Sequence, residues 1–221
     1  MMKLYCSPTS PYARKALILV HELGLGPERI TLTPVRANPN PTAASDSPML
    51  AQHNPLAKLP VLILDDGVTA IYDSTVICQY LDSLRGQDDK GHCCFFPRES
   101  DPSRWTQLTL HALATGMCEA ASMCVYERNP TIRAAEFYSQ AVVDAQWAKI
   151  ARGLDELELR ARAKRLDGWT IGEVAVVCVL GYLDLRFAEK AWREGRPALA
   201  AWAAKAEEER ASVRETKPPP A

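Results

Sequence analysis

The fold of this chain is decided by residues 3–20, KLYCSPTSPYARKALILV. Residues 3–6 form a short stretch that is typical of a strand. Ser10 then suits the N-cap of a helix, Pro11 its first position and Gly24 its C-terminal end. Apolar side chains recur at the spacing of a buried helix face, at Ala13, Ala16, Leu17 and Val20. The segment therefore predicts a strand, a tight turn and a helix.

The stretch that follows completes an α/β pattern. Residues 30–33 alternate as a strand does, which makes the opening a βαβ unit. Residues 60–64 and 69–72 predict two strands joined by Asp65-Asp66-Gly67, a typical hairpin turn. Ser74 is expected to cap the next helix. The side chains expected to be buried in that helix are Val76, Ile77, Tyr80 and Leu81. This order of elements is that of a thioredoxin-like domain.

From about residue 103 onward the sequence predicts only helices. One helix runs from Ser103 to about Tyr126. Asn129-Pro130 breaks the helical pattern, and a second long helix continues to about Arg165. An all-α domain is therefore expected after the α/β domain.

A third helix in this half is indicated by a capping box. Thr170 stands at the N-cap and Glu173 at N3, while Trp169 and Val174 can form a hydrophobic staple. Residues 174–182 are apolar on nearly every side, which is typical of a helix at the centre of a bundle. We therefore predict an α/β thioredoxin-like N-terminal domain followed by an all-α helical-bundle C-terminal domain. The predicted boundaries are residues 1–83 for the first domain, 84–102 for a linker and 103–221 for the second domain.

Composition excludes several other classes of protein. The chain has 26 basic and 27 acidic residues and a net charge of −1, so nothing favours a nucleic-acid partner. Its longest uninterrupted apolar run, residues 174–180, is far shorter than the ~18 residues of a membrane-spanning helix. No signal peptide is evident, and a cytoplasmic location is expected. The seven cysteines form neither a CxxC motif nor a metal-binding spacing, so we expect buried, reduced thiols and no metal.

These motifs resemble those of the cytosolic glutathione S-transferases, and most of all small bacterial members of the Ser-containing, theta- or omega-like kind. The resemblance is carried, in order, by KLYCSPTSPYARK (3–15), NPLAKLPVL (54–62), Asp73-Ser74, the capping box 170–173, RPAL (196–199) with Trp202, and Lys217-Pro218. It covers nearly the whole chain. It implies a homodimer that uses glutathione as co-substrate and acts in detoxification.

The resemblance implies that Ser10 donates a hydrogen bond to the glutathione thiolate. Such a bond is worth ~1.5–3 kcal/mol and the helix N-terminus adds ~0.3–1, together roughly 1.3–3 pKa units. That would ionise most of a thiol whose pKa starts near ~8.5, without a general base. From the residues alone, Ser10 can equally be a plain N-cap. Thr9, one residue earlier, and Tyr5, at the end of the strand, stay open as alternative donors.

The remaining glutathione contacts are also implied by the resemblance. Pro60 corresponds to a cis-proline that leaves the Leu59 backbone free to pair with the cysteinyl backbone of glutathione. Ser74 would bind the γ-glutamyl carboxylate at a helix N-terminus, Asp73 the ammonium and Lys58 the glycyl carboxylate. Pro11 belongs to the same binding set. The alternatives are an ordinary Asp-Ser cap and a solvated lysine.

The second substrate is expected to be a small apolar electrophile bound between the 9–12 turn and the helix from Ser103. The candidate contacts are Tyr12, Arg104, His111 and Thr115. A lone histidine on such a helix can also be a structural residue. The expected function is a glutathione transferase that activates the thiolate for attack on this electrophile. The alternatives are a glutathione-dependent reductase, which the serine at position 10 disfavours, an isomerase, whose double-Ser-Cys turn is missing here, and a non-catalytic glutathione-binding stress-response module.

Overall fold

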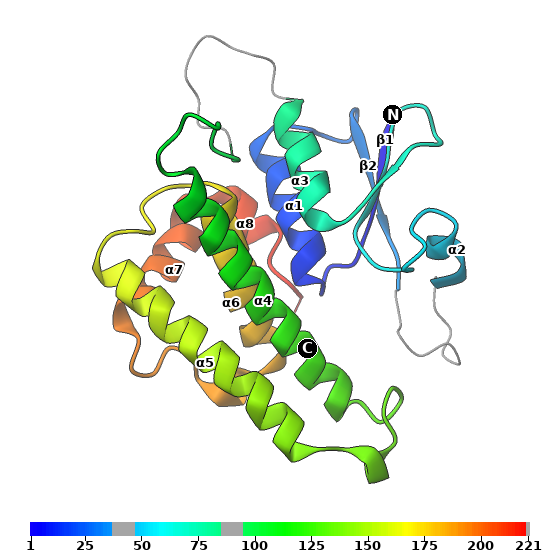
Figure 1. The fold of residues 1–221 in the computed structure, drawn as a ribbon. Helices are drawn as coiled ribbons and strands as arrows, with labels where there is room; N and C mark the ends of the chain where they lie inside the picture. The colour runs from blue at the N-terminus through cyan, green and yellow to red at the C-terminus, as the bar shows by residue number, and fades with distance from the viewer. Residues whose placement is uncertain (37–46, 85–94, 220–221) are drawn as a thin grey trace.

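A computed structural model describes residues 1–36, 47–84 and 95–219 (Figure 1). A small sheet with its helices forms the N-terminal half, and a bundle of longer helices forms the C-terminal half. This arrangement confirms the predicted fold class. Most of the predicted linker lies outside the described residues, as do Cys93, Cys94 and the last two residues.

The sheet has the strand order β2-β1-β3-β4. Its strands are β1 (Met2–Cys6), β2 (Ile30–Pro34), β3 (Val61–Ile63) and β4 (Ala70–Ile71). β1 pairs in parallel with β2 and antiparallel with β3, and β3 pairs antiparallel with β4. This is the predicted βαβ unit followed by a hairpin.

Helices cover both faces of the sheet (Figure 1). The helices α1 (Pro11–Glu22) and α3 (Ser74–Ser83) pack side by side on one face, and the short α2 (Ser47–Ala51) lies on the other. Because side chains alternate along a strand, Leu62 joins the core under α1 and α3, whereas its neighbour Val61 packs with Leu50 of α2.

Helix α1 begins and ends as the sequence predicts. Ser10 is the N-cap, and its Oγ accepts a hydrogen bond from Ala13 N at 3.2 Å. At the other end Gly24 adopts a positive φ of 61°, and the N–H groups of Gly24 and Leu25 bond back to the last carbonyls of the helix. Glycine adopts this backbone conformation without the steric penalty of a Cβ.

Helix α3 corrects two predictions. Its N-cap is Asp73 and not Ser74, because Asp73 Oδ1 accepts hydrogen bonds from Thr75 N and Val76 N. Aspartate and serine both satisfy free helix N–H groups, so an Asp-Ser pair leaves the choice open at sequence level. Val76 is exposed, not buried, whereas Ile77 and Leu81 are in the core as expected.

The C-terminal half contains five α-helices within the described residues. They are α4 (Arg104–Arg128), α5 (Gln140–Arg162), α6 (Ile171–Arg186), α7 (Pro197–Glu209) and α8 (Ala211–Glu215). Short 3₁₀ turns occupy Ala135–Phe137 and Ala188–Lys190. The break at Asn129-Pro130 is confirmed, but α5 begins only at Gln140, because the connection before it contains turns and the 3₁₀ turn at Ala135–Phe137.

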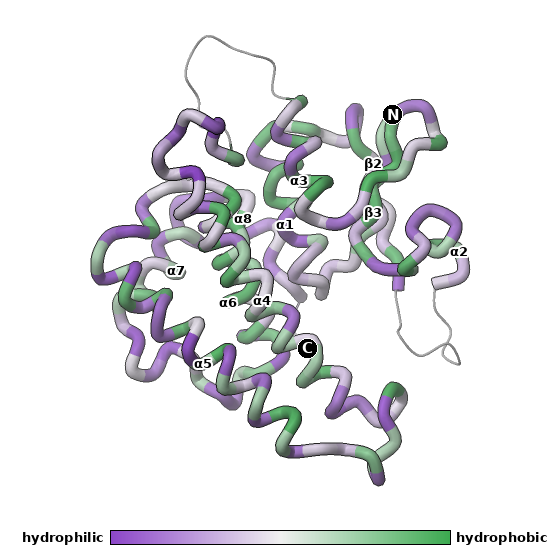
Figure 2. The backbone as a smooth tube through the Cα atoms, viewed as in Figure 1, coloured by the Kyte–Doolittle hydropathy of each residue, from purple (hydrophilic) through white to green (hydrophobic). Residues whose placement is uncertain are grey.

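Helix α6 lies at the centre of the molecule. Residues 171–180 are all buried, and α6 contacts both α1 and α4. The predicted capping box is present: Thr170 Oγ1 accepts from Gly172 N at 3.3 Å, and Glu173 Oε2 accepts from Thr170 N at 2.9 Å. Figure 2, in which the backbone is coloured by residue hydropathy, shows hydrophobic residues gathered where α4 and α6 lie.

Helix α4 qualifies a prediction about membranes. Uninterrupted apolar runs suggested no spanning segment, yet α4 is long enough and has enough mean hydropathy to cross a bilayer. In the structure α4 packs between α5 and α6. The two helices approach closely where Met117 of α4 lies over Gly153 of α5, because a Cβ at Gly153 would lie only 2.5 Å from Sδ of Met117.

A buried arginine joins α1 to the helical half. Arg14 is 3% exposed, and its guanidinium donates to Val177 O at 3.2 Å, Val213 O at 2.9 Å and Thr216 Oγ1 at 3.3 Å. Burial lowers the pKa of this guanidinium. Gly181 leaves the room that the guanidinium occupies, since a Cβ at that position would overlap with Nη1 of Arg14.

We therefore expect Gly181→Ala to destabilise the protein by about 1–3 kcal/mol, because the added methyl group displaces a pinned side chain. Gly116→Ala is the matched control: its Cβ meets no atom within 4 Å, so α4 should be unchanged or gain up to ~1 kcal/mol. Urea unfolding of both variants measures the difference. Equal free energies of unfolding for the two would contradict the packing argument.

Candidate functional site

The sheet topology brings the predicted binding residues to one edge. Because β1 and β3 are antiparallel, the end of β1 lies beside the start of β3, with Tyr5 opposite Val61. The end of β4 lies near the same edge, with Ile71 opposite Leu62. The residues collected there are Ser10 and Pro11 after β1, Lys58, Leu59 and Pro60 before β3, and Asp73 and Ser74 after β4. The N-termini of α1 and α3 therefore meet at this edge.

The hydroxyl of Ser10 is placed to donate. Ser10 is partly exposed, and its Oγ accepts from Ala13 N, which leaves the hydroxyl proton for another acceptor. Pro11 has no N–H, and the N–H groups of Ala13 and Arg14 bond to Ser10. The N–H of Tyr12 and the helix dipole are therefore what favour an anion at this position. Thr9, by contrast, shares a hydrogen bond of 3.2 Å with Ser7. Tyr5 stacks on His53 with ring centroids 5.5 Å apart.

The loop before β3 is held by Asn54, a residue without a predicted role. Asn54 is 3% exposed; its Nδ2 donates to Lys58 O at 3.0 Å and its Oδ1 accepts from Leu56 N at 3.0 Å. The peptide bond between Leu59 and Pro60 is cis, as expected. The ladder between β1 and β3 ends at Val61, so the backbone of Leu59 lies beyond it. Lys58 has an exposed side chain.

Two residues begin α3 at the same edge. Asp73 is exposed, and Ser74 behind it is 2% exposed. Both hydrogen bonds that cap the helix go to Oδ1 of Asp73. The caps of α1 and α3 thus present one hydroxyl and one carboxylate at the shared edge.

Three of the four candidates for the second substrate converge on a residue that sequence reasoning missed. Lys15 is 2% exposed, and its Nζ lies 3.2 Å from His111 Nε2 and 3.4 Å from Thr115 Oγ1. The ring of Tyr12 lies 5.9 Å from the same ammonium. Arg104 does not join them, because its guanidinium donates to Pro97 O. A lysine within a helix is normally exposed, so nothing in the sequence indicates that Lys15 is buried.

The imidazole of His111 is neutral at physiological pH. Burial, reinforced by the charge of Lys15, lowers its pKa to about 4. Because an ammonium can only donate, Nε2 accepts from Lys15 and the ring proton lies on Nδ1. His111 is 7% exposed, so it holds Lys15 more than it lines an open cleft. Burial also raises the pKa of the Tyr12 hydroxyl.

The described cysteines are buried free thiols. Burial raises the pKa of Cys78 to about 12 and that of Cys178 to about 11, so both stay protonated at neutral pH. Cys6, next to the edge, also has a raised pKa because of burial. No group of three or more His, Cys, Asp or Glu side chains that could bind a metal occurs among the residues described.

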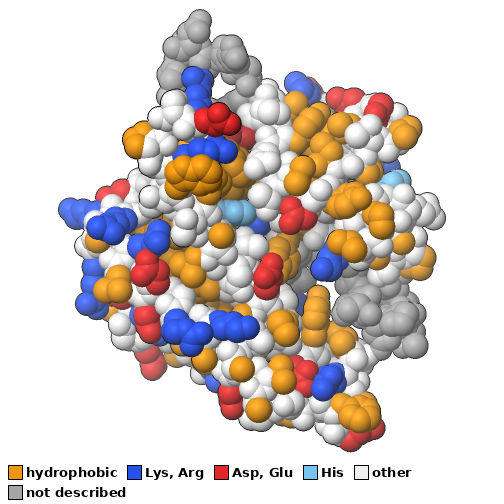
Figure 3. Space-filling model, viewed as in Figure 1, with side chains coloured by type: hydrophobic (Ala, Val, Ile, Leu, Met, Phe, Trp, Pro, Cys, Tyr) orange, Lys and Arg blue, Asp and Glu red, His pale blue; other side chains and the backbone are white. Residues whose placement is uncertain are grey.

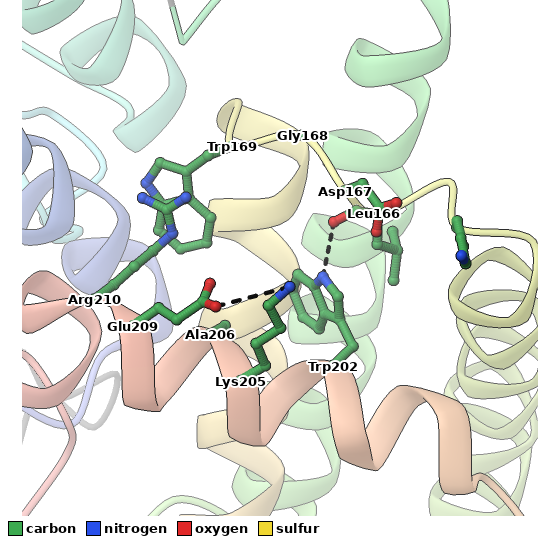
Figure 4. Close-up of a pocket in the computed structure, with 10 residues that line it drawn as sticks. Leu166, Asp167, Gly168, Trp169, Trp202, Lys205, Ala206, Glu209 and Arg210 are labelled. Atoms are coloured by element: carbon green, nitrogen blue, oxygen red, sulfur yellow. Dashed lines mark hydrogen bonds and ion pairs between the residues drawn. The ribbon is translucent and has the colours of Figure 1, made fainter.

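A cavity of about 430 Å³ lies away from this edge (Figure 4). It is formed by the loop before α6 and by α7, with Trp169 and Trp202 in its wall. The guanidinium of Arg210 lies 3.9 Å from the Trp169 ring centroid. None of the residues predicted for substrate binding lines it.

Comparison with known proteins identifies the family. Residues 9–84 match the model of the glutathione S-transferase N-terminal domain, and residues 140–205 match that of the C-terminal domain. The uncharacterized GST-like protein YibF of Escherichia coli K12 is 32% identical over 201 residues, 90% of each chain. The chain belongs to the glutathione S-transferase family.

Solved glutathione transferase structures agree along the full length. A glutathione transferase family member from Pseudomonas fluorescens Pf-5 with bound glutathione is 37% identical, with a TM-score of 0.88 over 99% of this chain and 100% of that one. A structure of a family member from the same strain with bound S-(propanoic acid)-glutathione has 36% identity and a TM-score of 0.82 over the same shares. The N-terminal family match contains the whole shared edge, whereas α4, with His111 and Thr115, lies between the two matched ranges.

The depressed pKa of His111 predicts a pH-dependent stability. The unfolded side chain has a pKa near 6.5 and the folded one near 4, so stability is full above pH 6.5 and is lost as the pH falls toward 4. Between pH 7.5 and 4.5 the wild type should lose about 2 kcal/mol more than His111→Gln. Urea unfolding across this range measures both. Parallel profiles for the two proteins would show that His111 is not held neutral.

Proposed function

We propose that this chain is a glutathione transferase that activates the glutathione thiolate for attack on a small apolar electrophile. The observation that carries the proposal is the meeting of two helix N-termini at one edge, with the free hydroxyl of Ser10 at the first and the Asp73-Ser74 pair at the second. An anion is stabilised at each terminus. Glutathione has a thiolate and a γ-glutamyl carboxylate to place there.

In this proposal Ser10 is the catalytic residue. Its hydroxyl donates to the thiolate, while Ala13 N occupies one of its lone pairs and fixes the orientation of Oγ. Thr9 and Tyr5 are the weaker alternatives, because one is bonded to Ser7 and the other is stacked on His53. Proton removal needs no separate base, because the hydrogen bond from Ser10 and the helix N-terminus lower the thiol pKa and the proton leaves to water.

The rest of glutathione extends along the same edge. The Leu59 backbone, beyond the end of the β1–β3 ladder, pairs with the cysteinyl backbone, and Pro60 completes that wall. Ser74 takes the γ-glutamyl carboxylate and Asp73 the ammonium, through the oxygen that does not cap α3. Lys58, exposed before β3, reaches the glycyl carboxylate. Pro11, which is buried next to Ser10, completes the part of the site that holds the cysteinyl thiol of glutathione.

Transfer is favoured over reduction by two observations. The Pseudomonas relative with bound S-(propanoic acid)-glutathione holds a thioether, the kind of product that forms when the sulfur attacks carbon. The described cysteines of this chain are buried, and a reductase that forms mixed disulfides needs an accessible thiolate. The electrophile would lie between the 9–12 turn and α4, near Tyr12 and Thr115.

The active form proposed here is a cytoplasmic homodimer that takes part in detoxification. Exposed apolar side chains support an interface on the side of α3 and α4: Tyr72 is 37%, Val76 46% and Trp105 74% exposed. Figure 3 shows hydrophobic side chains gathered over the N-terminal half of this face. Sedimentation at micromolar concentration should give twice the chain mass, and a monomer would contradict the dimer.

The catalytic role is tested by the thiol pKa of bound glutathione. Ultraviolet absorbance of the thiolate, followed against pH, should give a value well below that of free glutathione in the wild type. Ser10→Ala should raise it by about 1–2 units, because a hydrogen bond to a charged group is lost. Turnover of 1-chloro-2,4-dinitrobenzene at neutral pH should fall roughly 10-fold or more.

Matched variants separate the alternative donors. Thr9→Val and Tyr5→Phe each remove one hydroxyl and should leave the thiol pKa unchanged. A low pKa that survives Ser10→Ala but not one of these would move the role to that residue. Wild type that binds glutathione without lowering its pKa would be a binding module, and no binding at all would overturn the proposed function.

A further inference from the structure

Lys15 is a buried cation without an anionic partner. Its side chain is 2% exposed, and the partners of its ammonium are a neutral imidazole and a hydroxyl, His111 Nε2 at 3.2 Å and Thr115 Oγ1 at 3.4 Å. No ion pair joins it to any carboxylate in residues 1–36, 47–84 and 95–219. Burying a charge in this way is unfavourable unless an opposite charge compensates it.

The groups that face Lys15 leave its charge largely uncompensated. From α1 it faces Tyr12, and Arg14 beside it is a second buried cation; Glu22, the acid at the end of that helix, lies seven residues further on and accepts from Ser212. From α4 it meets His111, which is neutral at pH 7, and from α3 and α6 the protonated thiols Cys78 and Cys178. The thiol of Cys118 on α4 is likewise protonated, because burial raises its pKa.

Of the acids that act on this cluster, Asp73 belongs to the proposed site itself, whereas Asp82 acts on Cys78 and Glu119 on Cys118 and Tyr12. Asp73, the N-cap of α3, opposes the effect of Lys15 on the pKa of His111 and on that of Cys78. Because Oδ1 of Asp73 already binds two N–H groups of α3, its charge is shared with that helix. The cluster around Lys15 and the edge that would bind glutathione are therefore electrostatic neighbours.

The position of Lys15 on α1 directs its charge toward the thiolate. Lys15 follows Ser10 by five residues, about 7.5 Å of helix rise. Long helical side chains point back toward the N-terminus, so the ammonium lies toward the Ser10 end of α1 from its own Cα, beside the ring of Tyr12. An unpaired positive charge within about 10 Å, at an effective dielectric of about 20, shifts a thiol pKa by on the order of one unit.

We propose that Lys15 is a positioning residue of the transferase site, whose buried ammonium stabilises the glutathione thiolate at Ser10 while His111 and Thr115 hold it in place. This inference rests on the proposed function. Lys15 does not touch the sulfur; it acts through the field that it adds to the N-terminus of α1. The thiolate in turn is the anion that compensates the buried cation, so each favours the charged form of the other.

The test compares Lys15→Met with Lys15→Arg, which keeps the charge. Lys15→Met should raise the thiol pKa of bound glutathione by about one unit, and Lys15→Arg should restore most of the wild-type value. Affinity for S-methylglutathione, which has no thiolate, should stay within about twofold in both, since no ionised sulfur is involved. Lys205→Met removes an exposed charge on α7 and serves as the control, with no change expected in either quantity.

Each outcome decides whether Lys15 acts through its positive charge or only as a structural link between α1 and α4. If Lys15→Met weakens S-methylglutathione and glutathione equally and leaves the thiol pKa unchanged, Lys15 merely joins α1 to α4 and the inference is overturned. If Lys15→Met does not fold, Lys15→Gln keeps a donor for His111 without the charge, and the same pKa criterion applies. A wild-type pKa that is not lowered would overturn the proposed function, whereas a lowered value that survives Lys15→Met and Lys15→Gln overturns only the role of Lys15.

Discussion

The structure depends on the burial of two adjacent cations on α1 between its two halves. The guanidinium of Arg14 donates from each of its three nitrogens to a neutral acceptor, namely two carbonyls from α6 and α8 and the hydroxyl of Thr216. Removing these acceptors would leave a buried charge with neither water nor protein partners, so the helices around it are tied to one arrangement. Since Ser10 caps the same helix, the geometry of the candidate site follows from how α1 is fixed against the bundle.

Local signals predicted the parts of the fold that local chemistry determines. The cap at Ser10, the turn at Gly24 and the box at Thr170 each depend on a few neighbouring residues, and each was found where the sequence placed it. Prediction failed where two residue types satisfy one requirement, as at Asp73 and Ser74, or where a loop has no strong signature, as before α5. Solvent exposure of Val76 depends on what packs against α3, which periodicity alone does not reveal.

The candidate site divides in the same way. Residues that the N-terminal half supplies lie close to capping and turn motifs, so sequence and resemblance named them together. The link from Lys15 to α4 joins residues far apart in the sequence, and only tertiary packing shows it. Arg104 lies on the same helix as His111 and Thr115 but begins it, two to three turns away, and its guanidinium donates to Pro97 O instead of joining them.

The contact between Gly153 of α5 and Met117 of α4 has a consequence for how the sequences of related proteins can diverge. The side chain of Met117 occupies the space that this glycine leaves, so a larger residue at position 153 would force that side chain to move. Thr115, two residues before Met117, lies on the opposite side of α4 and faces Lys15, so it takes no part in the contact with α5. Substitutions at Thr115 therefore need not disturb the contact between α4 and α5, so the side of α4 that holds the scaffold and the side that faces Lys15 can diverge separately.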